Sequence, residues 1–269
     1  MASAVWNGVV TFGLVTLPIR LVTATESHAT RFRQIQRGTA DRVRNKRVNE
    51  RTGEEVDAAE IVKGFEVGDA YIIVEPTELD DIAPGRSRAL EITSFVDVAA
   101  IDLVYFDRTY YLAPQASEYN GVYALLHHAM WKARRAGIGM LVMHQRQYLV
   151  AVTADPDGVL AAHTLRWADE VRDPRKELPE LPEDKAAPVG RAADMAVRLV
   201  EALSADWNPA EHRDEYQEQV RELLTAKMTG EPVPKAAPAP PATGTQDLLS
   251  ILEASVEKAK ETRSEPPST

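Results

Sequence analysis

The chain has 269 residues, of which 44% are hydrophobic and 27% are charged, and it contains no cysteine. This composition is typical of a globular protein, and the lack of cysteine excludes disulfides, thiolate zinc sites and cysteine nucleophiles. The formal net charge of −10 would argue against a nucleic-acid partner if it were spread evenly, because phosphate repels an acidic surface.

The charge is instead arranged in blocks of opposite sign. Residues 20–51 carry nine basic and three acidic side chains, and residues 108–154 carry five and one. Residues 52–107 carry three basic and fourteen acidic side chains, and residues 155–269 carry fourteen and twenty-three. The two basic blocks are therefore the parts of the chain that could face a polyanion.

Alternating apolar residues and turn signals predict that the first 170 residues or so are rich in β-structure. One amphipathic helix is predicted among the strands at 117–136, with Gly137 as its stop signal. The predicted strands cover 4–12, 17–24, 70–75, 89–96, 104–112, 138–144, 147–153 and 159–167.

A proline-rich stretch at 173–188 separates the β-rich region from two predicted helices. The first covers about 190–204, and the second has Asn208 as N-cap and Pro209 at its first helical position. The second helix also has an apolar face, which would permit dimerisation. That face consists of Tyr216, Val220, Leu223 and Leu224.

The C-terminal part of the chain begins with a linker and ends with a short helix. Residues 230–244 contain five prolines and no aromatic residue, which is typical of a semi-extended linker. The apolar stripe of the short helix that follows could dock in the groove of a partner protein or fold back on its own core. The stripe consists of Leu248, Leu252, Val256 and Ala259.

No arrangement typical of an active site is present. The sequence lacks a Gly-rich phosphate loop, a His-Glu-x-x-His motif, a serine elbow and a calcium loop. His127 and His128 are adjacent, but successive helix positions point about 100° apart, which disfavours a shared metal. Asp80 and Asp81 are interpreted as acids near a helix start. We therefore expect a binding protein with no catalytic residues, no metal and no cofactor.

The segment 31–47 is the best candidate for a nucleic-acid surface. Arg42, Arg44 and Lys46 are two residues apart, as are Arg31 and Arg33, so an extended backbone would place the members of each set on one face. Few apolar residues are available to bury the segment, which favours an arm that contacts phosphates without sequence preference. The alternative is a solvated loop neutralised by the acidic block that follows. The candidate residues are Arg31, Arg33, Arg37, Arg42, Arg44, Lys46 and Arg47.

A second basic cluster closes the predicted helix at 117–136. Lys132, Arg134 and Arg135 form it, and Arg146 follows in the next block. These four are secondary candidates for DNA contact. The alternative is that cations near a helix C-terminus stabilise the helix dipole by about 0.3–1 kcal/mol.

Several motifs in the chain resemble those of the prokaryotic Ku proteins. The resemblance is nearly continuous over 5–230 and no single motif carries it. The motifs are WNGVVTFGLVTLPI at 6–19, RFRQI at 31–35, NKRV at 45–48, IVKGFE at 61–66, YYLAP at 110–114, LRWADEVR at 165–172, DEYQEQVREL at 214–223 and DLLSILEASV at 247–256.

The resemblance implies a mixed, mainly β fold. Its parts would be an antiparallel β-barrel core over 1–188 with a DNA-encircling bridge at about 28–70, a helical dimerisation arm at 189–229, the linker at 230–244, and a ligase-recruiting helix and tail at 245–269. Two chains would form a ring that takes up a double-stranded DNA end. Two departures stand out: Asn49 and Thr52 replace a Cys-x-x-Cys turn, and the lysine-rich tail of some relatives is missing.

The function that the resemblance implies is that of a non-catalytic DNA-repair factor. It would be a homodimer that binds and protects DNA ends and recruits the multifunctional ATP-dependent ligase of non-homologous end joining. No signal peptide and no apolar run of about 18 residues occur, so we expect a soluble cytoplasmic protein, associated with the nucleoid and not with a membrane. The alternative is a protein-interaction adaptor with incidental DNA binding. A nuclease is the weakest possibility, because clustered metal-binding carboxylates are missing.

Overall fold

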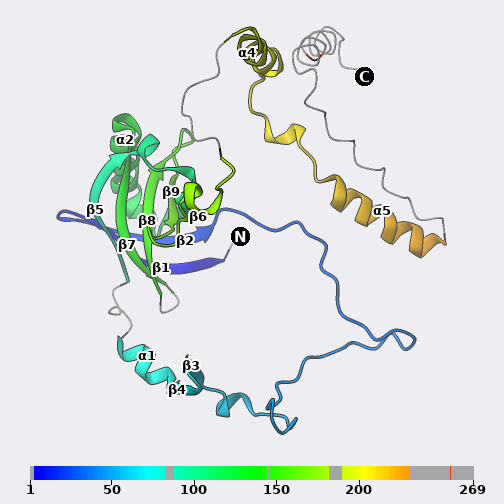
Figure 1. Ribbon diagram of the computed structural model, residues 1–269. Coiled ribbons are helices and arrows are strands. Elements are labelled where there is room, and N and C mark those ends of the chain that lie inside the picture. The colour runs from blue at the N-terminus through cyan, green and yellow to red at the C-terminus, as the bar shows by residue number, and fades with distance from the viewer. Residues whose placement is uncertain (1–2, 83–87, 144–145, 182–189, 231–254, 256–269) are drawn as a thin grey trace. The chain divides into compact units, whose positions relative to one another are not determined.

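Seven strands close into a β-barrel (Figure 1). Around the barrel they follow the order β1-β2-β6-β9-β8-β7-β5. Every neighbouring pair is antiparallel except β1 and β5, which run parallel and close the barrel. The strands are β1 (Ala4–Phe12), β2 (Val15–Thr23), β5 (Ala89–Asp97), β6 (Phe106–Pro114), β7 (Arg135–Met143), β8 (Arg146–Ala154) and β9 (Leu160–Leu165).

This computed structural model describes residues 3–82, 88–143, 146–181, 190–230 and 255. The chain divides into two compact units. The first comprises Met1–His28 and Phe32–Leu178, and the second comprises Ala29–Arg31 and Pro179–Thr269. The barrel confirms the expected mainly β core, and its single parallel pair makes it mixed rather than wholly antiparallel. Among the described residues, no helix combines the length and apolar composition that a bilayer span requires.

The alternation of side chains explains why the barrel has apolar clusters on both faces of some strands. In β8, Val150 and Val152 join the larger cluster, whereas Ala151 between them joins a smaller one. Because successive side chains of a strand point to opposite faces, β8 is buried on both sides. The larger cluster also contains Leu126 and Met130 of α2 (Asn120–Ala133), so the helix contributes to the barrel core.

Two glycines allow neighbouring strands of the barrel to approach closely. A Cβ on Gly8 of β1 would lie 2.1 Å from the carbonyl oxygen of Arg88, next to the β1–β5 pair. A Cβ on Gly139 of β7 would lie 2.2 Å from the carbonyl oxygen of Glu91 in β5. Real Cβ atoms do not come this close to backbone oxygen, so each position requires glycine.

The predicted helix at 117–136 was too long at its C-terminal end. It begins with the 3-10 turn η4 (Ser117–Tyr119), and α2 ends at Ala133. Arg134 then reverses the chain in a left-handed conformation, with φ of 53°, and β7 begins at Arg135. Gly137 is not a helix stop but lies in β7, where a Cβ would meet Ile92 at 3.0 Å. Close strand packing therefore explains this glycine.

The second C-terminal helix starts later than the capping signals indicated. Asn208 does accept a hydrogen bond as an N-cap, but it caps only the 3-10 turn η5 (Pro209–Glu211). Helix α5 (Glu215–Thr229) starts after Asp214, whose carboxylate accepts the N–H of Gln217. The preceding helix, α4 (Arg191–Leu203), lies where the sequence predicted it.

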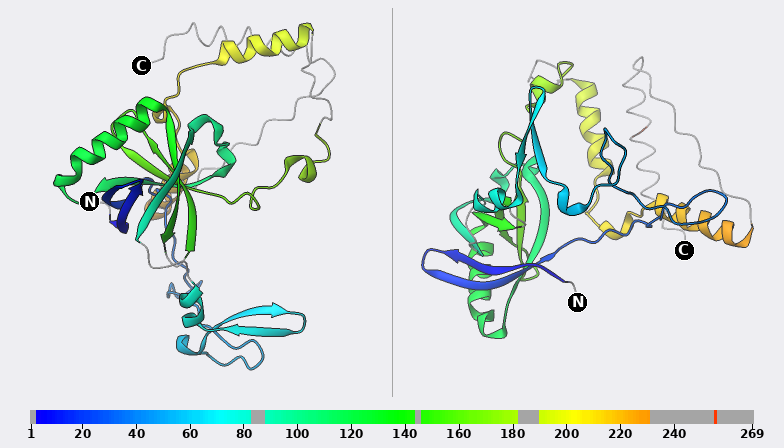
Figure 2. Two further views of the ribbon diagram at one scale, coloured as in Figure 1. Left: turned by 90° about the vertical axis from the view of Figure 1, so that its left-hand side faces the viewer. Right: turned by 90° about the horizontal axis from the view of Figure 1, so that it is seen from below.

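The long connection between β2 and β5 contains further elements that are separate from the barrel sheet. A two-stranded ribbon is formed by β3 (Lys63–Val67) and β4 (Ala70–Val74), and it is seen clearly in Figure 2. The strand β3 was not predicted. Helix α1 (Pro76–Ile82) follows, and Asp80 and Asp81 belong to its end rather than to its start. The remaining short elements are η1 (Ala58–Glu60), η2 (Val98–Ala100), η3 (Leu103–Tyr105) and α3 (Pro174–Glu177).

One histidine links three strands of the barrel. His163 in β9 lies with Nδ1 2.9 Å from the hydroxyl of Thr109 in β6 and Nε2 2.9 Å from the hydroxyl of Thr153 in β8. Its ring also packs edge-on against Phe106, with centroids 5.3 Å apart. Burial lowers the pKa of His163 below its usual value, because desolvation disfavours the imidazolium.

The barrel should consequently lose stability as the pH falls through about 6.5, the unfolded-state pKa of histidine. Below that pH the unfolded chain binds a proton at His163 that the folded chain resists, so the free energy of unfolding decreases toward lower pH. Thermal melts between pH 7.5 and 5 would measure the decrease. His163→Gln, which cannot titrate, should show a shallower pH dependence than the wild type. An unchanged pH dependence would contradict this role of His163.

Candidate nucleic-acid interface

Most of the basic segment folds back on itself as a short hairpin. In this first hairpin, residues 31–44, Ile35 pairs with Arg42. The N–H of Gln36 donates to the carbonyl of Asp41 at 2.8 Å, and the N–H of Val43 donates to the carbonyl of Gln34 at 3.0 Å. The turn between them runs through Gly38 at φ of 96° and Ala40 at φ of 60°. This places Arg37 at the tip of the hairpin.

All side chains of the first hairpin are exposed, including its three larger apolar ones. The hairpin contains five arginines and only one acidic residue, Asp41. Phe32, Ile35 and Val43 are too few to build a core, so the hairpin keeps its guanidinium groups in solvent. Guanidinium groups pair well with phosphate oxygens through parallel N–H donors. The exposed arginines therefore suit the first hairpin to bind a polyanion.

A second hairpin, residues 46–56, follows directly. Val48 pairs with Glu55, and the N–H of Asn49 donates to the carbonyl of Glu54 at 2.8 Å. The turn is held by the side-chain carbonyl of Asn49, which accepts the N–H groups of Arg51 at 3.0 Å and Thr52 at 3.3 Å. Gly53 completes it with φ of 72°. The turn is thus closed by an asparagine side chain.

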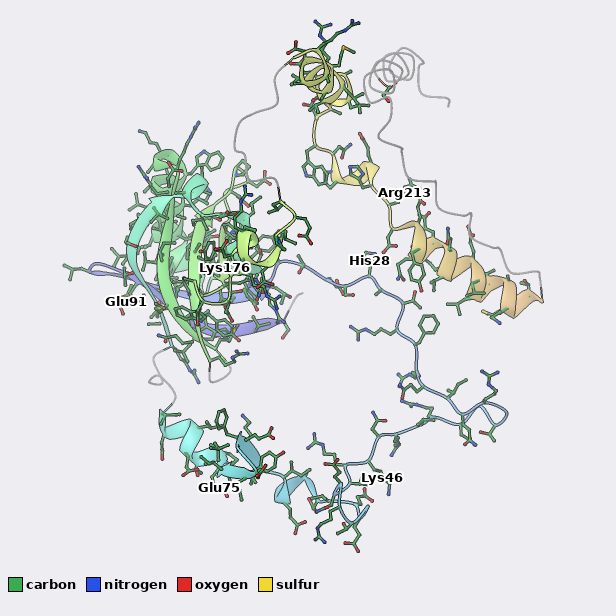
Figure 3. The ribbon with its side chains drawn as sticks, in the orientation of Figure 1. His28, Lys46, Glu75, Glu91, Lys176 and Arg213 are labelled. Atoms are coloured by element: carbon green, nitrogen blue, oxygen red, sulfur yellow. The ribbon has the colours of Figure 1, made fainter. Side chains whose placement is uncertain are left out.

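The second hairpin neutralises its own charge. It contains three basic and three acidic side chains, and Lys46 Nζ lies 2.6 Å from Glu55 Oε2. Figure 3 shows Lys46 on the arm. Both partners are exposed, so the pair contributes little stability, but Glu55 competes with any phosphate for this lysine. The face expected to hold Arg42, Arg44 and Lys46 together is therefore divided between two hairpins of different charge.

The four secondary candidates lie on three different elements of the barrel unit. Lys132 is in the last turn of α2, Arg134 is its left-handed cap, and Arg146 begins β8. Arg135 begins β7, and its Nη1 lies 3.9 Å from a carboxylate oxygen of Asp97. Lys132 and Arg134 thus close the helix as expected, whereas Arg135 belongs to the strand that follows. Arg51 is a further exposed cation, in the turn of the second hairpin, and its place at the end of the basic block could have indicated it.

The residues proposed for dimerisation differ in exposure. Tyr216 is exposed, Leu223 and Leu224 are half-buried, and Val220 is buried.

The structure adds two exposed apolar surfaces that the sequence did not indicate. One is the β3–β4 ribbon, and the other is on α4, where Val197, Val200 and Leu203 are exposed. The partner-binding stripe, from Leu248 to Ala259, lies outside the described residues, as does the linker from 231 onward.

Groups of three or more histidine, aspartate or glutamate side chains that could hold a metal ion do not occur within the described ranges. A pocket in the barrel unit is lined by ten residues including Tyr111, Tyr123 and Val159. Tyr123 uses its hydroxyl structurally, donating to the carbonyl of Leu112 at 2.9 Å and accepting the N–H of Leu160 at 2.7 Å. These bonds tie α2 to β6 and β9, and they do not form a reactive pair.

Comparison with known proteins identifies similar sequences over nearly the whole chain. The family described as "Ku70/Ku80 beta-barrel domain" matches residues 11–195. The chain is 52% identical to non-homologous end joining protein Ku 3 of Saccharopolyspora erythraea, over 94% of this chain and 96% of that protein. It is 47% identical to Ku 1 of the same organism, over 98% and 81%. It is 33% identical to the non-homologous end joining protein Ku of Mycobacterium tuberculosis, over 98% of each.

Proposed function

Because the chain belongs to the Ku family, we propose that it binds the ends of double-stranded DNA in non-homologous end joining. It does so as a homodimeric ring, without sequence preference and without catalysis of its own. The observation that carries the proposal is the first hairpin, which exposes five arginines against one acid on a chain whose net charge is −10. The cations are concentrated where a polyanion can reach them.

The dimensions of the first hairpin suit the backbone of duplex DNA. Residues 31–44 folded back on themselves reach about 23 Å at a rise of about 3.3 Å per residue. One turn of DNA is about 34 Å long. The hairpin can therefore follow a large part of a turn and contact several phosphates. Contacts of this kind fix the protein on the duplex but do not distinguish base pairs.

The β3–β4 ribbon supports assembly of two copies. Phe65 and Ile72 are 68% and 57% exposed, and Tyr71 and Ile73 are 68% and 62% exposed. The pairing of Phe65 with Ile72 places the first two on one face, and alternation places Tyr71 and Ile73 on the other. An isolated two-stranded ribbon is marginally stable in water. A second copy that covers these faces stabilises the ribbon, because burial contributes about 25 cal/mol per Å² of apolar surface.

Recruitment of the ATP-dependent ligase is assigned to residues 245–269. Its support is the apolar stripe of Leu248, Leu252, Val256 and Ala259 behind a proline-rich linker. Such a tethered stripe suits docking in a groove of a partner. This part of the proposal is independent of DNA binding, because the basic hairpin and the stripe are distant in the sequence.

Binding should require a free DNA end and should depend steeply on salt. In gel shifts over a salt series, a linear blunt-ended duplex should bind and a covalently closed circle of the same sequence should bind much more weakly. Replacing Arg37, Arg42 and Arg44 by Ala should lower affinity for the linear duplex about tenfold or more. The slope of log affinity against log salt should fall by about 3, because each lost phosphate contact contributes about 0.9.

The matched control replaces Lys46, Arg47 and Arg51 by Ala, which removes the same charge from the second hairpin. Its affinity and salt slope should change less, because that hairpin is neutral overall and Lys46 is already paired with Glu55. Equal losses for the two triple variants would contradict the assignment to the first hairpin. Equal affinity for linear and closed DNA would contradict the ring.

The dimer is tested by placing a charge on the β3–β4 ribbon. Ile72→Asp should convert the protein from a dimer to a monomer of 29.7 kDa, because a buried unpaired carboxylate is costly at an apolar interface. Light scattering coupled to size exclusion measures the mass. Glu66→Gln, an exposed polar position on the same ribbon, should leave the dimer intact. A monomeric wild type would contradict the dimer, and a dimeric Ile72→Asp would contradict the ribbon's part in it.

Loss of the C-terminal stripe should separate ligase recruitment from end binding. The double change Leu248→Glu and Leu252→Glu, or a chain ending at residue 244, should no longer stimulate the ligase. Affinity for a blunt duplex should stay within about twofold of the wild type, since the changed residues are distant in the sequence from the basic hairpin. Ligation assays and gel shifts measure the two properties. Loss of both properties in the double variant would contradict a separable tail.

A further inference from the structure

The residues just before the first hairpin contact a helix that is far away in the sequence. Ala29–Arg31 belong to the same compact unit as α5 and not to the unit of the barrel. Within that unit, the backbone N–H of Thr30 donates to the side-chain carbonyl of Gln217 at 2.9 Å. Thr30 is half-buried, whereas Ala29 and Arg31 on either side of it are exposed. Thr30 is therefore a point at which the chain is held on α5, between two exposed residues.

The glutamine that holds Thr30 is itself well fixed. Gln217 is half-buried in the first turn of α5, and its N–H donates to the Asp214 carboxylate at 3.0 Å. The backbone carbonyl of Gln217 accepts the side-chain N–H of Arg221 at 3.2 Å. The backbone of Gln217 thus takes part in the helix cap, while its side-chain oxygen binds Thr30. The side-chain bond links two segments and is not needed to form the helix.

We propose that Gln217 is a positioning residue for DNA binding: by holding Thr30 on α5, it restrains the chain at the start of the first hairpin. This role rests on the proposed function of that hairpin. Arg31 directly follows Thr30, and Arg33 is two residues further on, so the restraint acts next to two of the five arginines. Gln217 contacts no phosphate. It acts by reducing the freedom that the hairpin loses when it binds DNA.

The physical basis is preorganisation. Each backbone residue that becomes ordered on binding costs conformational entropy, and a contact that orders it beforehand removes part of this cost from the binding step. A hydrogen bond of ordinary net strength then changes affinity about three- to tenfold. By linkage, DNA that orders the hairpin strengthens the contact between Thr30 and Gln217 in return.

The restraint can be measured without DNA. Limited trypsin digestion of the full chain, followed by mass spectrometry, gives the rate of cleavage at the Arg31–Phe32 bond. Gln217→Ala should raise this rate about three- to tenfold, because cleavage follows the population in which the segment is detached. Gln217→Glu retains an acceptor oxygen and should restore the wild-type rate. Gln219→Ala, an exposed glutamine on the same helix, is the matched control and should leave the rate unchanged.

The effect on DNA binding is measured with a blunt duplex over a salt series. Gln217→Ala should weaken affinity about three- to tenfold and leave the salt slope at the wild-type value, because the number of phosphate contacts is the same. A lower slope would mean that the variant loses phosphate contacts, and would overturn the positioning role. Wild-type cleavage and affinity in Gln217→Ala, or equal effects of Gln219→Ala, would overturn it too. If the wild type does not bind DNA, the proposed function and the positioning role both fail, and the cleavage rates alone decide whether Gln217 holds Thr30.

Discussion

The closure of the barrel by the parallel pair of β1 and β5 is the constraint on which the rest of the structure depends. Two adjacent parallel strands cannot be joined by a tight turn, so at least one further segment must lie between them in the chain. Here β1 returns as β2 through a hairpin, and the chain reaches β5 only at Ala89. The seam is tight: the N–H of Val9 donates to the carbonyl of Arg88 at 2.8 Å, and Gly8 leaves no room for a Cβ. A larger residue at Gly8 would separate the strands that close the barrel.

Barrel closure also explains why the connection stays exposed. Every strand of the barrel has two neighbours, so no open edge remains for the segments between β2 and β5 to join. These segments pair among themselves, as two short hairpins and the β3–β4 ribbon. The closed barrel thus leaves both the arginines of the first hairpin and the apolar residues of the ribbon exposed. One set suits a polyanion, and the other suits a second copy of the chain.

The two hairpins of this connection differ in charge. The first contains five arginines and one acidic residue, whereas the second contains three basic and three acidic residues and pairs Lys46 with Glu55. The contact of Thr30 with Gln217 adds a restraint just before the first hairpin, from a helix whose own start is set by Asp214. The unpaired charge and the backbone restraint thus lie together at the start of the first hairpin. We infer that both contribute to the affinity for DNA.

The sequence by itself determined the features that depend on near neighbours along the chain. Runs of strand-forming residues between turn signals located β1, β5 and β8, the density of arginine located the basic segment, and the order of motifs indicated the family. Tertiary structure decided the features that depend on distant residues. Gly137 had the signal of a helix stop, yet its proximity to Ile92 places it in a strand; Asn208 had the signal of a helix cap, yet α5 starts after Asp214. The parallel closure and the bond between Thr30 and Gln217 have no local signature, because each joins residues that only the folded chain brings together.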